Sequence, residues 1–218
     1  MTRSGDITID KQGGIEGFIQ FALIGQEALH WRQLALSNDE AEVRKQFDHW
    51  LESISPDGVE ARIDRFHALD QPDQKLLADV SVKGTPGTAT SKRLMLPAFF
   101  FETRGDVHPF VAEEKRLEPV DMHYGEIVTD QITYHLPDGF TVEGAPQDTK
   151  LTWPGQAVFV AKSVSSPGQI ILARSLARAF TFVKPDEYQD LRGFYQKVAA
   201  ADQAPLVLTA APAAAKGN

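Results

Sequence analysis

The stretch Lys75-Leu-Leu-Ala-Asp-Val-Ser-Val-Lys83 is the most informative part of the sequence for the fold class. Every second side chain from Leu76 to Val82 is apolar, and most of the side chains between them are polar. This period of two is typical of a β-strand that buries one face and exposes the other. We predict that the ranges 59–68 and 88–96 are neighbours of this strand in one antiparallel sheet.

Upstream of this strand, the sequence predicts a β-hairpin and two helices. Asp6–Asp10 and Gly14–Leu23 flank a tight turn with two glycines, which readily take the positive φ that such turns need. The helices are expected over 25–36 and 38–54.

The second helix carries the clearest helical pattern. We expect Ser37 to be its N-cap and Glu40 to complete a capping box. Apolar side chains then recur at helical spacing, at Val43, Phe47, Trp50, Leu51 and Ile54. We predict that Phe47 and Trp50 anchor the helix to a sheet.

The second half of the chain is predicted to be rich in β-strands. The expected strands are 126–136, 140–143, 149–153, 157–164, 170–183 and a last short strand at 206–208. Pro137-Asp-Gly139 is a strong turn signal between the first two. Short strands at this spacing are typical of a sandwich, and Pro185 opens a helix expected over 185–203.

These patterns predict an α+β fold that is mostly antiparallel β, with two β-sandwich-like subdomains and a few peripheral helices. We place the first, β-rich subdomain with two helices at 1–117. The second, with a terminal helix, is placed at 118–208. The irregular segment 97–118 would connect them, and the Ala- and Pro-rich tail 209–218 is expected to be disordered.

The composition excludes several functional classes. The 218 residues carry a formal net charge of -8, and no basic face or tail stands out, so nucleic acid is not an expected partner. No stretch approaches the ~20 apolar residues of a membrane-spanning helix. Because the chain has no cysteine, a thiol nucleophile, a disulfide and a Cys-ligated metal are all excluded.

No sequence motif for catalysis is present. The chain lacks a phosphate-binding loop, an HExxH motif and a GxSxG motif. A Ser-His-Asp site assembled in space would not show in the sequence, but nothing raises one candidate above the others. We therefore assign no catalytic residue, no cofactor-binding residue and no cofactor.

Four side chains are candidate metal ligands. Asp106, His108, Asp121 and His123 lie in or beside the connector, and the last two would share one face of an extended segment. Because they lack a recurrent ligand spacing, we interpret them as scattered surface residues and assign no metal site.

Other histidines and aromatic residues are interpreted as structural. His30 and His49 stand beside tryptophans in the predicted helices, where packing at the edge of the core explains them better than catalysis. The run Phe99-Phe-Phe101 is predicted to belong to the core or to an interdomain contact rather than to a ligand platform.

Several short sequence motifs follow one another in a recognisable order. They are Gly25-Gln-Glu-Ala-Leu-His-Trp-Arg32, Arg93-Leu-Met-Leu-Pro97, Arg116-Leu-Glu-Pro-Val-Asp-Met-His-Tyr124, Leu136-Pro-Asp-Gly-Phe140, Arg174, Lys184-Pro185, Glu187-Tyr188, Leu191-Arg192 and Phe194-Tyr195. This order resembles the C-terminal region of bacterial multidomain transglutaminase-like proteins, which is β-rich and follows a central papain-like core. The resemblance spans the chain from about Gly5 to Leu208.

The resemblance implies an accessory region and not an enzyme, because the Cys-His-Asp triad of that family belongs to the core. The chain would pack against an upstream transglutaminase-like domain and shape substrate access to it. A peptide- or cell-wall-glycan-binding module is the alternative, and a self-contained hydrolase is a third. We expect a monomer from a larger periplasmic or secreted precursor. A cytoplasmic location stays open, because no apolar signal core follows Met1.

Overall fold

A computed structural model describes residues 1–102 and 110–211. The strands are β1 (Thr2–Ile9), β2 (Ile15–Leu23), β3 (Val59–His67), β4 (Leu76–Gly84), β5 (Thr88–Ala89), β6 (Arg93–Pro97), β7 (Val120–Asp121), β8 (Glu126–His135), β9 (Phe140–Gly144), β10 (Thr149–Trp153), β11 (Ala157–Ser166), β12 (Gln169–Arg178), β13 (Phe182–Val183) and β14 (Pro205–Ala210). The helices are α1 (Gly25–Ser37), α2 (Glu40–Ile54), α3 (Tyr188–Asp202) and the short 3₁₀ helix η2 (Pro185–Glu187). The predicted fold class is confirmed, since the chain is α+β, mostly antiparallel and built of β-sandwich-like parts.

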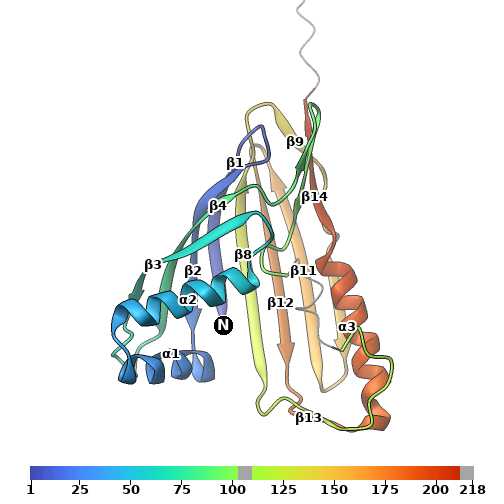
Figure 1. Cartoon of the computed structure of the whole chain (residues 1–218). Coiled ribbons are helices and arrows are strands. Elements are labelled where there is room, and N and C mark those ends of the chain that lie inside the picture. Colours follow the sequence, from blue (N-terminus) through green and yellow to red (C-terminus); the bar gives the residue numbers. More distant parts are fainter. Residues whose placement is uncertain (103–109, 212–218) are drawn as a thin grey trace, which may run out of the picture.

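The largest sheet has eight strands, in the order β10-β11-β12-β8-β1-β2-β4-β3 (Figure 1). All its pairs are antiparallel except β1 with β8, which are parallel. This parallel pair joins a strand of the predicted subdomain 1–117 to a strand of the predicted subdomain 118–208. The division into these two subdomains stays a prediction. A four-stranded sheet has the order β5-β6-β14-β9, and β7 pairs with β13.

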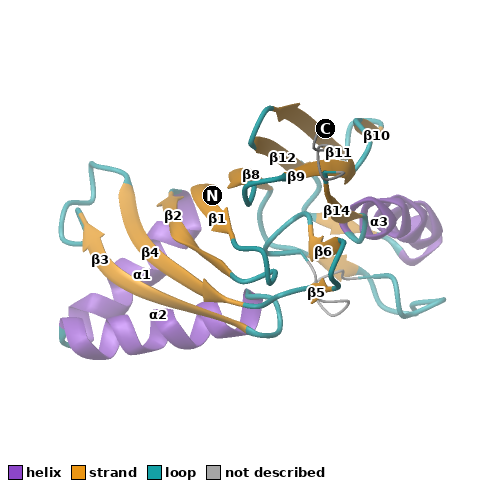
Figure 2. Cartoon of the chain, turned by 90° about the horizontal axis from the view of Figure 1, so that it is seen from above, coloured by secondary structure: helices purple, strands orange, loops and turns teal. Residues whose placement is uncertain are grey.

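One face of the eight-stranded sheet is covered by two separate layers (Figure 2). Helices α1 and α2 lie over β1–β4, and the four-stranded sheet with α3 lies over β8 and β10–β12. Apolar side chains on the covered face, such as Ile7, Val80 and Phe159, are fully buried. On the opposite face, alternate side chains of the same strands are exposed or half-buried. We call these surfaces the covered face and the open face.

Aromatic packing fixes α2 on the covered face. Phe47 is fully buried, and its ring centre lies 6.0 Å from that of Phe21 in an edge-to-face arrangement. Trp50 is half-buried, with its ring 5.5 Å from Phe21. Phe47 is therefore the central anchor of the helix, and Trp50 packs at the edge of the same cluster.

The predicted place of 88–96 is wrong. Strands β5 and β6 belong to the four-stranded sheet, where β6 pairs with β14. The physical reason is that β2 and β3 already occupy both edges of β4, so no hydrogen-bonding edge of β4 remains for them.

The predicted start of α2 is also wrong. Ser37 is the last residue of α1, and Asp39 is the N-cap of α2. The Asp39 carboxylate accepts a hydrogen bond from the backbone N–H of Glu42 at 2.9 Å. A carboxylate at this position also interacts favourably with the helix dipole, which a serine hydroxyl does not.

The turn predicted at Pro137-Asp-Gly139 is present. It connects β8 of the eight-stranded sheet to β9 of the four-stranded sheet. The N–H of Phe140 donates to the Pro137 carbonyl at 3.0 Å, and Gly139 has a φ of 81°. At the C-terminal end, β14 includes Thr209 and Ala210, which the sequence had placed in the tail. In the part of the chain described, no helix is both long and apolar enough to cross a membrane.

Candidate functional site

Three charged side chains form a row across the middle of the eight-stranded sheet, on its covered face. Asp130 of β8 lies in register with Arg3 of β1 on one side and with Arg174 of β12 on the other. All three are buried, and their neighbours on the same strand faces, such as Ile132 and Leu172, are apolar. Charges in such surroundings are costly unless they are paired, so the partners of this row decide whether it is stable.

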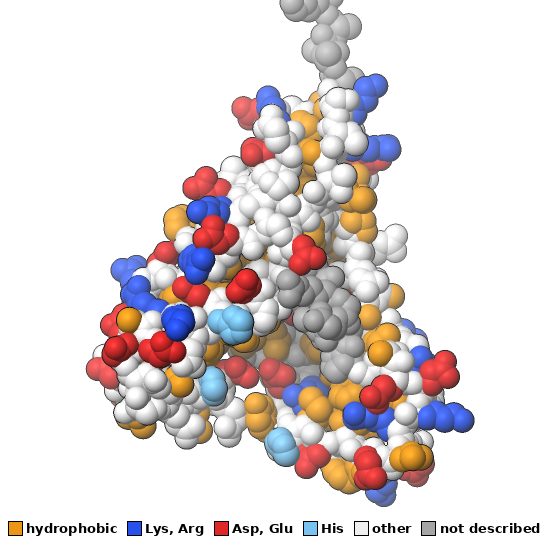
Figure 3. Space-filling view, in the orientation of Figure 1, with side chains coloured by type: hydrophobic (Ala, Val, Ile, Leu, Met, Phe, Trp, Pro, Cys, Tyr) orange, Lys and Arg blue, Asp and Glu red, His pale blue; other side chains and the backbone are white. Residues whose placement is uncertain are grey.

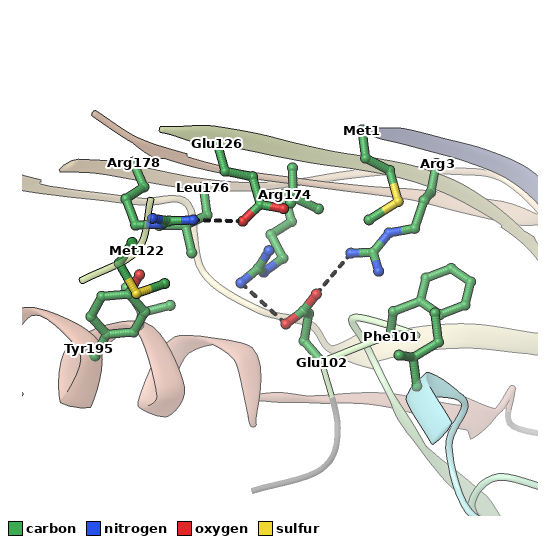
Figure 4. A pocket seen from close by; sticks show the side chains of 13 residues that line it. Met1, Arg3, Phe101, Glu102, Met122, Glu126, Arg174, Leu176, Arg178 and Tyr195 are labelled. Atoms are coloured by element: carbon green, nitrogen blue, oxygen red, sulfur yellow. Dashed lines mark hydrogen bonds and ion pairs between the residues drawn. The ribbon is translucent and has the colours of Figure 1, made fainter. Parts of the chain in front are cut away.

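Besides Asp130, the carboxylate partners come from α3 and from the segment that follows β6. Arg3 binds Asp130 through two nitrogens, with Nη2 2.7 Å from Oδ2. Arg174 binds Asp202, the last residue of α3, at 2.7 Å and 2.8 Å. Glu102 bridges the two arginines: Oε1 is 2.8 Å from Arg3 Nη2 and Oε2 is 3.5 Å from Arg174 Nη2 (Figure 4). These five residues form the buried ion network, and its two-pronged pairs are of the strongest type.

A third arginine extends the network along β12. Arg178 follows Arg174 on the same strand face and donates to the Tyr124 carbonyl at 3.0 Å and to Glu126 Oε2 at 3.1 Å. Each arginine also lies near an aromatic ring centre, at 4.4 Å for Arg3 and Phe101, 5.4 Å for Arg174 and Phe159, and 5.5 Å for Arg178 and Phe180.

The protonation states of these groups follow from their surroundings. Burial disfavours a charged guanidinium, but Asp130 and Glu102 outweigh it and raise the pKa of Arg3. Asp202 and Glu102 do the same for the pKa of Arg174. Burial raises the pKa of Tyr195 to about 12. These three side chains therefore keep their protons near neutral pH, which does not suit general acid–base catalysis.

A cavity of about 240 Å³ opens beside the buried ion network. It lies between the two covering layers, where Ile54 ends α2 and Tyr195 lies on α3. Met122 and Leu176 give it further apolar walls (Figure 4). Val128 lines it as well. The network thus ties α3 and the segment after β6 to the sheet, and the cavity is the space that remains beside them.

Comparison with protein families identifies the chain. Residues 92–208 match the model of a domain of unknown function with a solved structure, DUF3858. The chain belongs to the DUF3858 family. The matched range includes four members of the buried ion network, all except Arg3. No curated protein matches the DUF3858 chain.

One solved structure is weakly similar to part of the chain. It is a crystal structure of "a putative protease" from Parabacteroides distasonis ATCC 8503, with a TM-score of 0.43 and 15% sequence identity. The match covers 56% of the DUF3858 chain and 24% of the other, so this chain spans only a minor part of that protein's length. The narrower resemblance to the accessory region of transglutaminase-like proteins stays a prediction.

Two of the four candidate metal ligands of the DUF3858 chain lie among the described residues. Asp106 and His108 lie outside the described residues. Asp121 and His123 are close neighbours, but the contact is local: Asp121 Oδ1 accepts from the backbone N–H of His123 at 2.9 Å. Among the residues described, no three His, Asp or Glu side chains come together as metal ligands.

The aromatic and histidine predictions can be compared directly with the structure. Phe99, Phe100 and Phe101 are all buried, which confirms that this run belongs to the core. His30 and His49 are exposed and line a hollow of about 610 Å³ between α1 and α2, at the outer edge of the aromatic cluster.

The sequence reasoning missed the buried ion network, although β12 carried a signal for it. Ile170 and Leu172 occupy the buried phase of this strand, and Arg174 follows in the same phase. A charged residue there predicts a buried ion pair. Its partners could not be named, because Glu102 and Asp202 come from distant parts of the chain.

Proposed function

We propose that this DUF3858 chain is a non-catalytic accessory region that packs against a transglutaminase-like core and shapes substrate access to it. The observation that carries the proposal is the open face of the eight-stranded sheet. A sheet face with contiguous exposed apolar side chains commonly marks a protein–protein contact. The periplasmic or secreted location belongs to the same proposal.

Strands β8, β11 and β12 carry the apolar part of the open face. Ile127, Val158 and Val164 are 59%, 38% and 60% exposed. Ala177 of β12 lies between Ile127 and Val158 in register, and Ile171 lies opposite Val164. We call these five residues the aliphatic strip. They form two groups toward opposite ends of the strands. Between the groups, Lys162 of β11 is exposed on the same face, and its neighbours Ala173 and Ser175 on β12 are small.

The other half of the open face, on β1–β4, carries more charged side chains, and Asp79 at its centre is already paired. Asp79 accepts hydrogen bonds from Gln20, Arg65 and His67. Desolvating such groups costs free energy that a contact must recover, whereas burial of aliphatic side chains is favourable. We therefore expect the aliphatic strip to lie at the centre of a contact of about 600–1,500 Å², the usual range between domains.

The groups of the buried ion network support a non-catalytic role. Their charged atoms bind one another, and the arginines and Tyr195 keep their protons near neutral pH. Such a network holds α3 against the sheet. It differs from a catalytic arrangement, in which a neighbouring base activates a nucleophile. The cavity beside the network then serves packing or recognition.

The test measures binding of the chain to a separately expressed transglutaminase-like core by calorimetry. Val158→Asp places a charge in the aliphatic strip and should weaken binding by at least about tenfold. Leu36→Asp is the matched control, because Leu36 is an exposed apolar residue on α1, away from the open face. Equal binding by both variants contradicts the proposal. Peptidase or amine-transfer turnover by the chain alone, abolished by a point mutation, contradicts its non-catalytic part.

One observation favours the alternative of a peptide- or cell-wall-glycan-binding module. Phe18 is 68% exposed and borders a hollow of about 550 Å³ that Asp6, Gln20 and Asp79 also line. An aromatic ring beside polar groups is a common arrangement in binding sites. Titration with a soluble peptidoglycan fragment decides this alternative: binding that Phe18→Ala removes and Val158→Asp retains supports it.

A further inference from the structure

Strand β3 forms one edge of the eight-stranded sheet (Figure 2). Among the strands described, it pairs with β4 and has no strand on its other side. Such an edge presents backbone N–H and C=O groups with which a strand of another chain can pair. Whether β3 is open to a partner therefore depends on what already binds these groups.

The backbone of β3 alternates between N–H groups that face β4 and N–H groups that face outward. The N–H of Thr85 donates to the Gly58 carbonyl at 2.9 Å, which fixes this alternation at the start of the strand. The N–H groups of Val59, Ala61 and Ile63 therefore face outward. The N–H of Val59 already donates to a carbonyl of the preceding turn at 3.2 Å. The N–H of Ile63 is the central group of the edge.

Asp48 of α2 binds this outward N–H of Ile63. Its Oδ1 accepts the hydrogen bond at 2.7 Å, and its Oδ2 lies 3.6 Å from Nη1 of Arg62. The Asp48 side chain is 23% exposed, and Ile63 is buried. A hydrogen bond from an N–H to a carboxylate is stronger than the bond to a neutral carbonyl that a partner strand would offer. Asp48 therefore opposes strand pairing at the centre of β3.

The side chains of β3 favour one partner, a second copy of the same strand. Arg62 and Asp64 lie on the open face, and both are exposed. If two copies of β3 pair antiparallel about Ile63, the two Ile63 residues exchange backbone hydrogen bonds, and Arg62 of each copy lies opposite Asp64 of the other. Opposite charges placed directly across two strands are favourable. Figure 3 shows basic and acidic side chains interspersed over the side of the molecule where β3 and α2 lie.

We infer that Asp48 keeps β3 unpaired, and that the partner it excludes is a second copy of this chain joined through β3. The N–H that Asp48 binds is the one on which this pairing is centred, and the carboxylate also holds Arg62 close to its own chain. The register shift between Ile63 and Arg65 bends β3 and keeps the pairing short, so a dimer formed in this way is weak and reversible. This inference does not depend on the aliphatic strip or on the accessory role.

The main test is Asp48→Ala, which removes the acceptor and keeps a good helix former in α2. We expect this variant to form a dimer that dissociates on dilution, with self-association at least about tenfold tighter than that of the wild type. Sedimentation velocity over about 10–500 μM covers micromolar dissociation constants and measures this change. Asp48→Asn is the matched control: its amide oxygen can still accept from the Ile63 N–H, so it should stay monomeric like the wild type.

Two further measurements locate the contact. Arg62→Glu added to Asp48→Ala places an acidic side chain opposite Asp64 of the other copy, and should restore the monomer. Hydrogen exchange at the Ile63 amide should be slow in the wild type, faster in dilute Asp48→Ala and slow again in its concentrated dimer. Asp48→Leu also lacks an acceptor and repeats the test with a second side chain. Circular dichroism checks the fold of each variant.

The inference is overturned if Asp48→Ala keeps the native circular dichroism spectrum and stays monomeric at the highest concentration. It is also overturned if Asp48→Asn dimerises as strongly as Asp48→Ala. A dimer that persists when Arg62→Glu is added forms through another surface, which likewise contradicts the inference. If neither Asp48→Ala nor Asp48→Leu folds, Asp48 is required for folding itself, and the inference fails.

Discussion

Two clusters built around carboxylates lie on opposite faces of the same sheet and differ mainly in burial. On the covered face, the side chains of Arg174 and Asp202 are 3% and 0% exposed. On the open face, those of Arg65 and Asp79 are 66% and 22% exposed. Each carboxylate binds nitrogen donors at about the same distances, 2.7–2.8 Å in the first cluster and 2.8–2.9 Å in the second. Despite their similar geometry, we expect the two ion pairs to differ in energy, because water can replace a lost partner only on the open face.

The largest effect is expected for Asp202→Asn. This change removes the charge that compensates Arg174 in a fully buried position, and should lower the free energy of unfolding by about 3–5 kcal/mol. Urea unfolding measures it. The double variant Arg174→Met with Asp202→Leu removes both charges and should regain much of the loss. A loss below about 1 kcal/mol for Asp202→Asn would remove the proposed difference between the faces.

A smaller effect is expected for Glu102→Gln, about 1.5–3 kcal/mol. Glu102 bridges Arg3 and Arg174, but each arginine keeps its own two-pronged carboxylate partner. If the bridge makes the network one unit, the losses for Glu102→Gln and Asp202→Asn should not add in the double variant. Strict additivity would show that the two arginines are independent pairs.

The sequence predicted the apolar side chains of the covered face better than its buried ion network. Alternation in β4 correctly predicted a strand with one buried and one exposed face, and helical spacing correctly predicted Phe47 as an anchor of α2. Periodicity decides which way a side chain faces, but it does not decide which strand lies beside which. The parallel pairing of β1 with β8, which brings Arg3 beside Asp130, therefore could not be predicted.

The cluster on the open face should respond weakly to mutation. Asp79→Asn keeps the size of the side chain and leaves its partners accessible to water, so the loss of unfolding free energy should stay below about 1 kcal/mol. Asp64→Asn is the matched control, because Asp64 lies on the same face and accepts only from the Ser81 hydroxyl among the hydrogen bonds described. A loss for Asp79→Asn as large as that for Asp202→Asn would show that burial does not separate the two clusters.

The smallest effect is the pH dependence of the Asp79→Asn difference. Hydrogen bonds from Gln20 and His67, with Arg65, hold the pKa of Asp79 well below its usual range. In the unfolded chain, the pKa of an Asp carboxyl is about 3.9. A lowered pKa in the folded state means that ionised Asp79 stabilises the fold above that pH, and that this stabilisation is lost as the pH falls toward the folded pKa. The difference between wild type and Asp79→Asn should therefore be complete at pH 6–7, decrease below about pH 4.5 and shrink further in 1 M salt. Urea unfolding at pH 7, 5 and 3.5 measures it, and a difference that does not change with pH would show that the Asp79 charge adds nothing to stability on the open face.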